Sequence, residues 1–73
     1  MIRYKIKELL EVKSLREKRK ITLSEVAEAV GVQSSAMSKL ANNKGYTTTT
    51  TTLNELCKFF ECKIEELIEY IPE

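Results

Sequence analysis

Five polar side chains that lie close together in the sequence have the chemistry needed to recognise another molecule. They are Gln33, Ser34, Ser35, Ser38 and Lys39. Side chains of these types hydrogen-bond to base edges in duplex DNA: a lysine donates to guanine O6 or N7, and a glutamine pairs with adenine. Serine hydroxyls bond to bases or to phosphates. The segment is therefore a candidate for reading DNA, provided that neighbouring elements hold it at the surface.

The usual catalytic and metal-binding groups are missing from the sequence. It has no His and no Asp, so every side-chain carboxylate belongs to a Glu. Without these residues the common catalytic triads, dyads and metal sites cannot be assembled. Cys57 and Cys62 supply only two of the four ligands that a structural zinc site needs. We therefore expect no enzyme activity, no metal or other cofactor and no small-molecule substrate. Both cysteines are interpreted as small buried hydrophobes in a reducing compartment rather than as a redox pair.

Length and charge limit what the chain can do. Its 73 residues suffice for one domain, residues 1–73, with a small core. The net charge is +1, but residues 1–53 hold ten Lys or Arg against five Glu, whereas residues 54–73 hold two Lys against six Glu. One pole is thus basic and suited to phosphates, and the other is acidic. With no apolar stretch of membrane-spanning length and no signal peptide, the sequence predicts a cytoplasmic protein without a membrane partner.

Two short helices with a tight turn between them hold the candidate segment. Thr22 and Glu25 have the spacing of a capping box, which predicts a helix from Leu23. Gly31 ends that helix, and a second helix begins at residue 34 or 35 and ends within residues 42–45. Apolar residues at helical spacing give each helix a buried face: Leu23, Val26, Ala27 and Val30 in the first, and Ala36, Met37, Leu40 and Ala41 in the second. Such a pair is typical of the bihelical unit that reads DNA, although a plain helical hairpin has the same elements.

The flanking segments predict three more helices and two short strands. A strand at residues 2–5 precedes a helix that runs from residue 6 towards residue 20, with a break near Ser14. The threonines at 47–52 predict either an extended loop that contacts phosphate or a flexible linker, followed by a helix capped by Thr49 or Thr50. That helix carries Leu53, Leu56, Cys57, Phe59 and Phe60, and a short final helix carries Ile64, Leu67 and Ile68. Residues 70–71 are β-formers and are expected to pair with residues 2–5. The aromatic residues are expected to pack in the core or in strands rather than to stack on bases: Tyr4, Phe59, Phe60 and Tyr70.

The bihelical unit and the helices after it resemble Xre/Cro-type phage and bacterial repressors. The likeness lies in residues 21–32 (ITLSEVAEAVGV), residues 35–40 (SAMSKL) and residues 53–67 (LNELCKFFECKIEEL), and it covers most of residues 15–68. It implies an all-α, five-helix, lambda repressor-like DNA-binding domain that regulates transcription. In such proteins the second motif helix, here about residues 34–42, enters the major groove. The resemblance therefore implies a base-reading role for the five polar residues.

The same resemblance implies where the phosphate backbone would lie. The loop after the second motif helix tracks the backbone in this family, and here it contains Asn42, Lys44, Tyr46, Thr47 and Thr48. Three further candidates for phosphate contact precede or begin the first motif helix: Arg16, Arg19 and Thr22. The basic cluster at residues 16–20 is equally well interpreted as a solvated face with Glu17 as a local partner.

Two positions depart from the family pattern. Leu23 stands where the family usually has a Gln that touches phosphate. Ala41 stands where family members often have a Glu paired with an Arg of the first helix, so Arg16 needs another partner or is free for DNA.

We expect a homodimer that binds a double-stranded DNA operator with dyad symmetry and acts as a repressor. One small module rarely buries enough surface for specific binding, and two-fold proteins read half-sites about one helical turn apart. The strand segments 2–5 and 70–71, or the acidic last helix, are the expected interfaces. The alternative is a protein–protein interaction module, such as an antitoxin or an anti-repressor partner, that keeps the fold without binding an operator. The small net charge, Leu23 and Ala41 favour this alternative.

Overall fold

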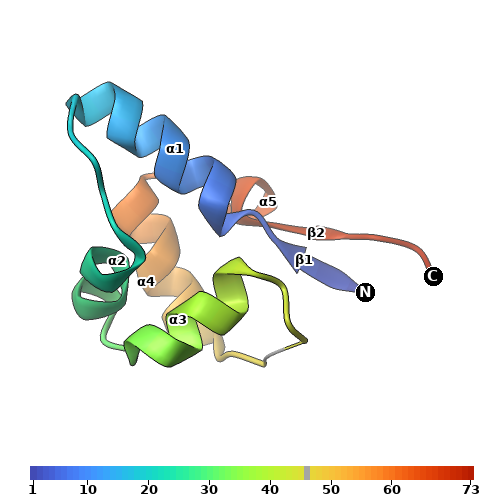
Figure 1. Cartoon of the computed structure of the whole chain (residues 1–73). Coiled ribbons are helices and arrows are strands. Elements are labelled where there is room, and N and C mark those ends of the chain that lie inside the picture. Colours follow the sequence, from blue (N-terminus) through green and yellow to red (C-terminus); the bar gives the residue numbers. More distant parts are fainter. Residues whose placement is uncertain (46) are drawn as a thin grey trace.

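The computed structural model describes residues 1–45 and 47–73. These residues form five helices and one two-stranded antiparallel sheet, joined by turns and loops (Figure 1). In chain order the elements are β1 (Ile2–Tyr4), α1 (Ile6–Glu17), α2 (Leu23–Val30), α3 (Ser34–Ala41), α4 (Thr50–Phe60), α5 (Ile64–Leu67) and β2 (Ile68–Tyr70). The expected five-helix fold with paired terminal strands is confirmed. None of the helices in these residues has the length and apolar character needed to cross a membrane.

Local capping chemistry sets the ends of α2. The Thr22 hydroxyl accepts a hydrogen bond from the Glu25 N–H at 3.2 Å. Gly31 ends the helix at φ 79°, a left-handed conformation that costs glycine little. The other half of the expected capping box is replaced, because the Glu25 carboxylate binds Arg19 rather than the Thr22 N–H. Glu25 therefore ties α2 to the segment that precedes it.

The core lies between the helices and supports the two motif helices, α2 and α3. The buried apolar side chains are Ile6, Ile21, Val26, Ala27, Val30, Met37, Leu40, Ala41, Leu56, Phe60 and Leu67. Leu23 and Ala36, which were expected on buried faces, are only half-buried. α2 packs against both α3 and α4, and α3 also packs against α1.

A buried lysine and two phenylalanines complete the packing between α1 and α4. The Lys13 ammonium lies 2.6 Å from a Glu17 carboxylate oxygen and 5.0 Å from the centre of the Phe59 ring. Both contacts compensate its charge in an apolar setting. Phe59 and Phe60 meet edge to face with ring centres 5.1 Å apart.

The cysteines lie at the end of α4 as free thiols. Cys57 and Cys62 are both half-buried against the core rather than fully buried. Burial raises the pKa of the Cys62 thiol to about 11. The structure thus gives them the packing role that the sequence predicts, with part of each residue exposed.

Two helices end earlier than expected. α1 stops at Glu17 rather than near residue 20, because Lys18 turns left-handed at φ 55°, and it runs through Ser14 without the expected break. α5 stops at Leu67, and Ile68 is extended at φ −129° and opens β2 instead of closing the helix. A β-branched side chain suits that extended position, where Ile68 pairs with Tyr4 of β1.

The threonine run is divided between a loop and a helix. Thr49 is the N-cap of α4, and its hydroxyl accepts a hydrogen bond from the Thr52 N–H at 3.2 Å, as expected. The last three threonines form the first turn of α4, where the cap satisfies backbone groups that a helix would otherwise leave unpaired. Thr47 and Thr48 remain in the loop.

β1 and β2 form a short ribbon in which Ile2, Arg3 and Tyr4 lie opposite Tyr70, Glu69 and Ile68. The expected strand pairing is confirmed, although β2 begins two residues earlier than expected. Figure 1 shows the ribbon extending from the helical body, with both chain termini at its far end. Side chains alternate between faces along a strand, so Ile2, Tyr4, Ile68 and Tyr70 share one face. Tyr4 and Ile68 are half-buried, whereas Ile2 and Tyr70 are 49% and 68% exposed. Of the aromatic residues, Tyr70 therefore contributes strand pairing rather than core packing.

Candidate nucleic-acid interface

The polar residues that the sequence assigns to base reading lie on the outer side of α3. Gln33, Ser34, Ser35 and Lys39 are exposed, and Ser38 is half-buried. Met37 and Leu40 of the same helix are buried at 0% and 1% exposure. α3 thus separates its residues into an apolar side that faces the core and a polar side that faces solvent. Figure 1 shows it along the lower border of the molecule, next to α2.

The carboxyl end of α3 is held by its own side chains and by α1. The Asn42 amide nitrogen donates to the Ser38 carbonyl at 2.8 Å and to the Ser38 hydroxyl at 3.3 Å. The Asn42 amide oxygen accepts from the Lys7 ammonium group of α1. Lys7 therefore places a positive charge beside a residue expected to contact phosphate. Because Lys7 lies 35 positions before Asn42, the sequence gave no sign that these two residues meet.

A shallow groove of about 280 Å³ lies between α3 and the loop that contains Thr47 and Thr48, the threonine loop. Its lining residues are Val32, Gln33, Ala36, Leu40, Thr47, Thr48, Thr49 and Thr52. The groove thus brings Gln33, a candidate for base reading, beside Thr47 and Thr48, which are candidates for phosphate contact. Lys44 is exposed at the start of the same loop. Tyr46, another candidate in this loop, lies outside the described residues.

Thr22 is exposed at the amino end of α2. Its hydroxyl oxygen accepts the capping bond from the Glu25 N–H, but a hydroxyl that accepts one bond still has a hydrogen to donate. Capping and a phosphate contact are therefore compatible at this residue.

The two arginines expected near phosphate both have carboxylate partners within the chain. The Arg19 guanidinium donates to the two Glu25 oxygens at 2.9 and 2.7 Å, and it lies 3.2 Å from a Glu17 oxygen. The paired guanidinium lowers the pKa of the Glu25 carboxyl. Arg16 lies 3.7 Å from a Glu61 oxygen, and both side chains are largely exposed. Glu61 is thus the partner that Arg16 finds in place of the family's acidic residue at position 41.

Two comparisons with known proteins found similar sequences. Residues 11–73 match the Cro/C1-type HTH DNA-binding domain. The chain is also similar to the uncharacterized HTH-type transcriptional regulator YozG of Bacillus subtilis (strain 168). The two are 31% identical over 62 residues, which cover 85% of this chain and 74% of the relative. The matched range begins within α1 and includes the two motif helices, the threonine loop and both helices after it.

Proposed function

Since the chain belongs to the Cro/C1-type HTH DNA-binding domain family, we propose that it is a transcriptional regulator that reads the major groove of duplex DNA with α3 and represses at its operator. The side chains that read bases are Gln33, Ser34, Ser35, Ser38 and Lys39. Asn42, Lys44 and the loop threonines Thr47 and Thr48 fix the register on the phosphates, as do Thr22, Arg16, Arg19 and, outside the described residues, Tyr46.

The observation that carries this proposal is the division of α3 into two sides. Its buried residues lock it onto α2 and the core, while four of the five candidate base-reading residues are exposed. A recognition helix needs both properties, because it must enter a groove about 12 Å wide without losing its position on the protein.

Selection of bound fragments from random duplex DNA tests the proposal directly. An enriched sequence with dyad symmetry is the expected result. Its affinity should fall as salt rises, with a logarithmic slope of about −0.9 for each phosphate contacted. Failure to enrich any sequence at low salt would contradict the proposal.

Two lysine substitutions separate base reading from phosphate contact. Lys39→Ala should cost about 1–3 kcal/mol on the selected site and relax the preference at one base position. Lys44→Ala should weaken selected and scrambled duplexes alike and reduce the salt slope by about 1. Equal effects of both variants on specificity would show that Lys39 does not read a base.

A protein–protein interaction module remains the competing function, and one observation favours it. Both Arg16 and Arg19 have glutamate partners, which reduces the positive charge available to phosphates. Such a module, acting as an antitoxin or an anti-repressor partner, need show no affinity for duplexes at any salt concentration. The salt titration above therefore distinguishes the two functions.

A further inference from the structure

Asn43 directly follows the end of α3 in an unusual backbone conformation. Its φ is 54°, in the left-handed region that Asn tolerates better than most residues other than Gly. Its N–H donates to the Leu40 carbonyl at 3.1 Å, so the residue closes the last turn of the helix. The chain therefore turns sharply at Asn43.

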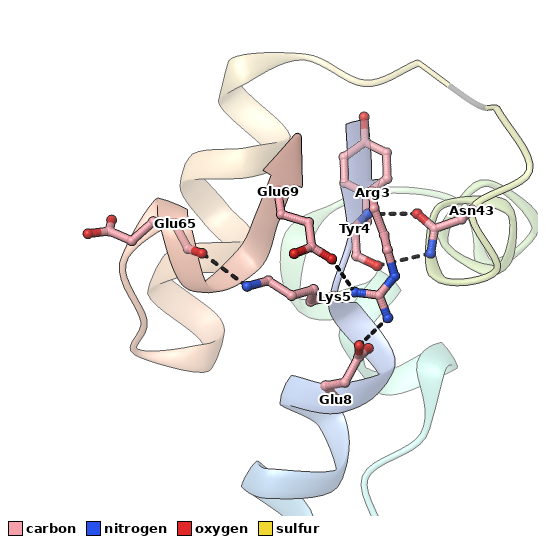
Figure 2. Close-up of polar contacts among 7 residues, drawn as sticks. All are labelled: Arg3, Tyr4, Lys5, Glu8, Asn43, Glu65 and Glu69. Atoms are coloured by element: carbon pink, nitrogen blue, oxygen red, sulfur yellow. Dashed lines mark hydrogen bonds and ion pairs between the residues drawn. The ribbon is translucent and has the colours of Figure 1, made fainter. Parts of the chain in front are cut away.

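The Asn43 side chain bonds to both backbone groups of Tyr4 on the outer edge of β1 (Figure 2). The Tyr4 N–H donates to Asn43 Oδ1 at 2.6 Å, and Asn43 Nδ2 donates to the Tyr4 carbonyl at 3.0 Å. A neighbouring strand would offer the same pattern of one acceptor and one donor. The amide thus takes the place of a third strand at this position of the ribbon.

β1 is itself held firmly, so the amide connects α3 to a fixed support. Arg3 donates to Glu69 of β2 at 2.7 Å and also binds Glu8 of α1. The Lys5 ammonium donates to the Glu65 carbonyl of α5 at 3.1 Å. In Figure 2, Glu65 and Glu69 lie on one side of β1 and Asn43 lies on the other. Three elements therefore restrain the strand to which Asn43 is bonded.

We propose that Asn43 is a positioning residue for DNA binding, which fixes the carboxyl end of α3 and the start of the following loop against the terminal ribbon. The loop begins with Lys44, whose N–H donates to the Lys39 carbonyl at 3.1 Å. Without the amide, the end of α3 and Lys44 lose their connection to β1. The part of this inference that concerns DNA rests on the proposed function.

Asn43→Gly is the main test, because Gly keeps the left-handed backbone and removes only the amide. The Tyr4 N–H should then exchange with solvent at least about tenfold faster in the DNA-free protein, and the Lys44 N–H should also lose protection. Affinity for the selected duplex should fall about threefold to tenfold, with a smaller loss for a scrambled duplex. Asn43→Asp keeps the acceptor for the Tyr4 N–H but cannot donate to the Tyr4 carbonyl when ionised, so intermediate losses are expected.

Glu61→Gly is the matched control, since Glu61 is also a left-handed residue at a helix end, φ 54°. It should leave the exchange of the Tyr4 and Lys44 amides unchanged. Unchanged protection of these amides in Asn43→Gly would overturn the inference, and so would faster exchange accompanied by unaltered DNA affinity and specificity. If the wild-type protein bound no duplex, the proposed function would fail. The DNA part of the inference would fail with it, and exchange of the Lys44 amide in Asn43→Gly would decide only whether Asn43 fixes the end of α3.

Discussion

Arg19 shows how a single residue can serve structure and still bear on DNA binding. Its guanidinium makes two parallel hydrogen bonds to Glu25, the geometry that suits an arginine and a carboxylate best. The pair connects the segment after α1 to the first turn of α2. Arg19 can contact a phosphate only by sharing its donors with Glu25 or by leaving it. We therefore expect Arg19 to contribute less to the salt dependence of binding than Lys44.

The pH dependence of Glu25 checks this pairing. Arg19 lowers the pKa of Glu25 in the folded protein below its ordinary value of about 4.3. The pair therefore stabilises the fold fully above that ordinary value, and this contribution is lost as the pH falls through the lower folded pKa. In Arg19→Ala the Glu25 pKa should rise towards its ordinary value, as followed by NMR titration of its side-chain carboxyl.

Arg16→Ala is the control for this titration, because it removes the same charge from the same cluster without touching Glu25. It should leave the Glu25 titration where it is in the wild type. A Glu25 pKa that did not change in Arg19→Ala would show that the guanidinium is not its main partner in solution.

At the scale of elements, the cap of α4 determines where the threonine loop ends. Six successive threonines favour no helix start by composition, so the bond from the Thr52 N–H to the Thr49 hydroxyl sets the boundary. Thr49→Ala should lower the free energy of unfolding by about 1 kcal/mol. For a domain of this size that corresponds to a fall in Tm of roughly 4–8 °C, measured by calorimetry or circular dichroism.

Thr51→Ala is the matched control for Thr49→Ala, since Thr51 is exposed within the first turn of the same helix. Ala has the higher helix propensity, so this change should be neutral or stabilise by a few tenths of a kcal/mol. Equal losses from both variants would mean that the threonine run is stabilised by something other than the Thr49 cap.

Local signals in the sequence predicted the elements well where the chemistry was local. The Thr22 and Thr49 caps, Gly31 and the apolar spacing of α2 and α3 act within one or two helical turns, and they appear in the structure except that Leu23 and Ala36 are only half-buried. The polar side of α3 was found by the same reasoning. Its role in reading bases stays a prediction.

What the sequence did not predict depends on contacts between distant elements. Lys7 meets Asn42 across 35 positions, and Asn43 meets Tyr4 across 39. Ile68 satisfies a helical spacing, but its strand partner is at the opposite end of the chain. Periodicity carries no information on such pairs, because it describes one element at a time.

At the scale of the whole molecule, the terminal ribbon has an apolar face but poorly available edges. On the outer edge of β1, the Tyr4 backbone groups are occupied by Asn43. On β2, the Ile68 N–H donates to the Ile64 carbonyl, and Pro72 beyond the strand has no N–H. Edges blocked at these positions are less suited to pairing with another strand. A dimer is therefore expected to use the face of the ribbon rather than to extend its sheet.

Ile2 and Tyr70 are the residues through which we expect two copies to meet. They lie opposite each other on one face, 49% and 68% exposed, beyond the part of the ribbon that packs on the core. Tyr70→Glu should turn a dimer into a monomer in sedimentation and weaken binding to the two-fold operator, because two linked modules bind more tightly than one. Val12→Glu places the same charge on a 55% exposed apolar residue of α1 and should leave the dimer intact. A wild-type protein that stayed monomeric at every concentration, with and without DNA, would rule out the dimer. If Val12→Glu abolished the dimer and Tyr70→Glu did not, the dimer interface would lie on α1 instead.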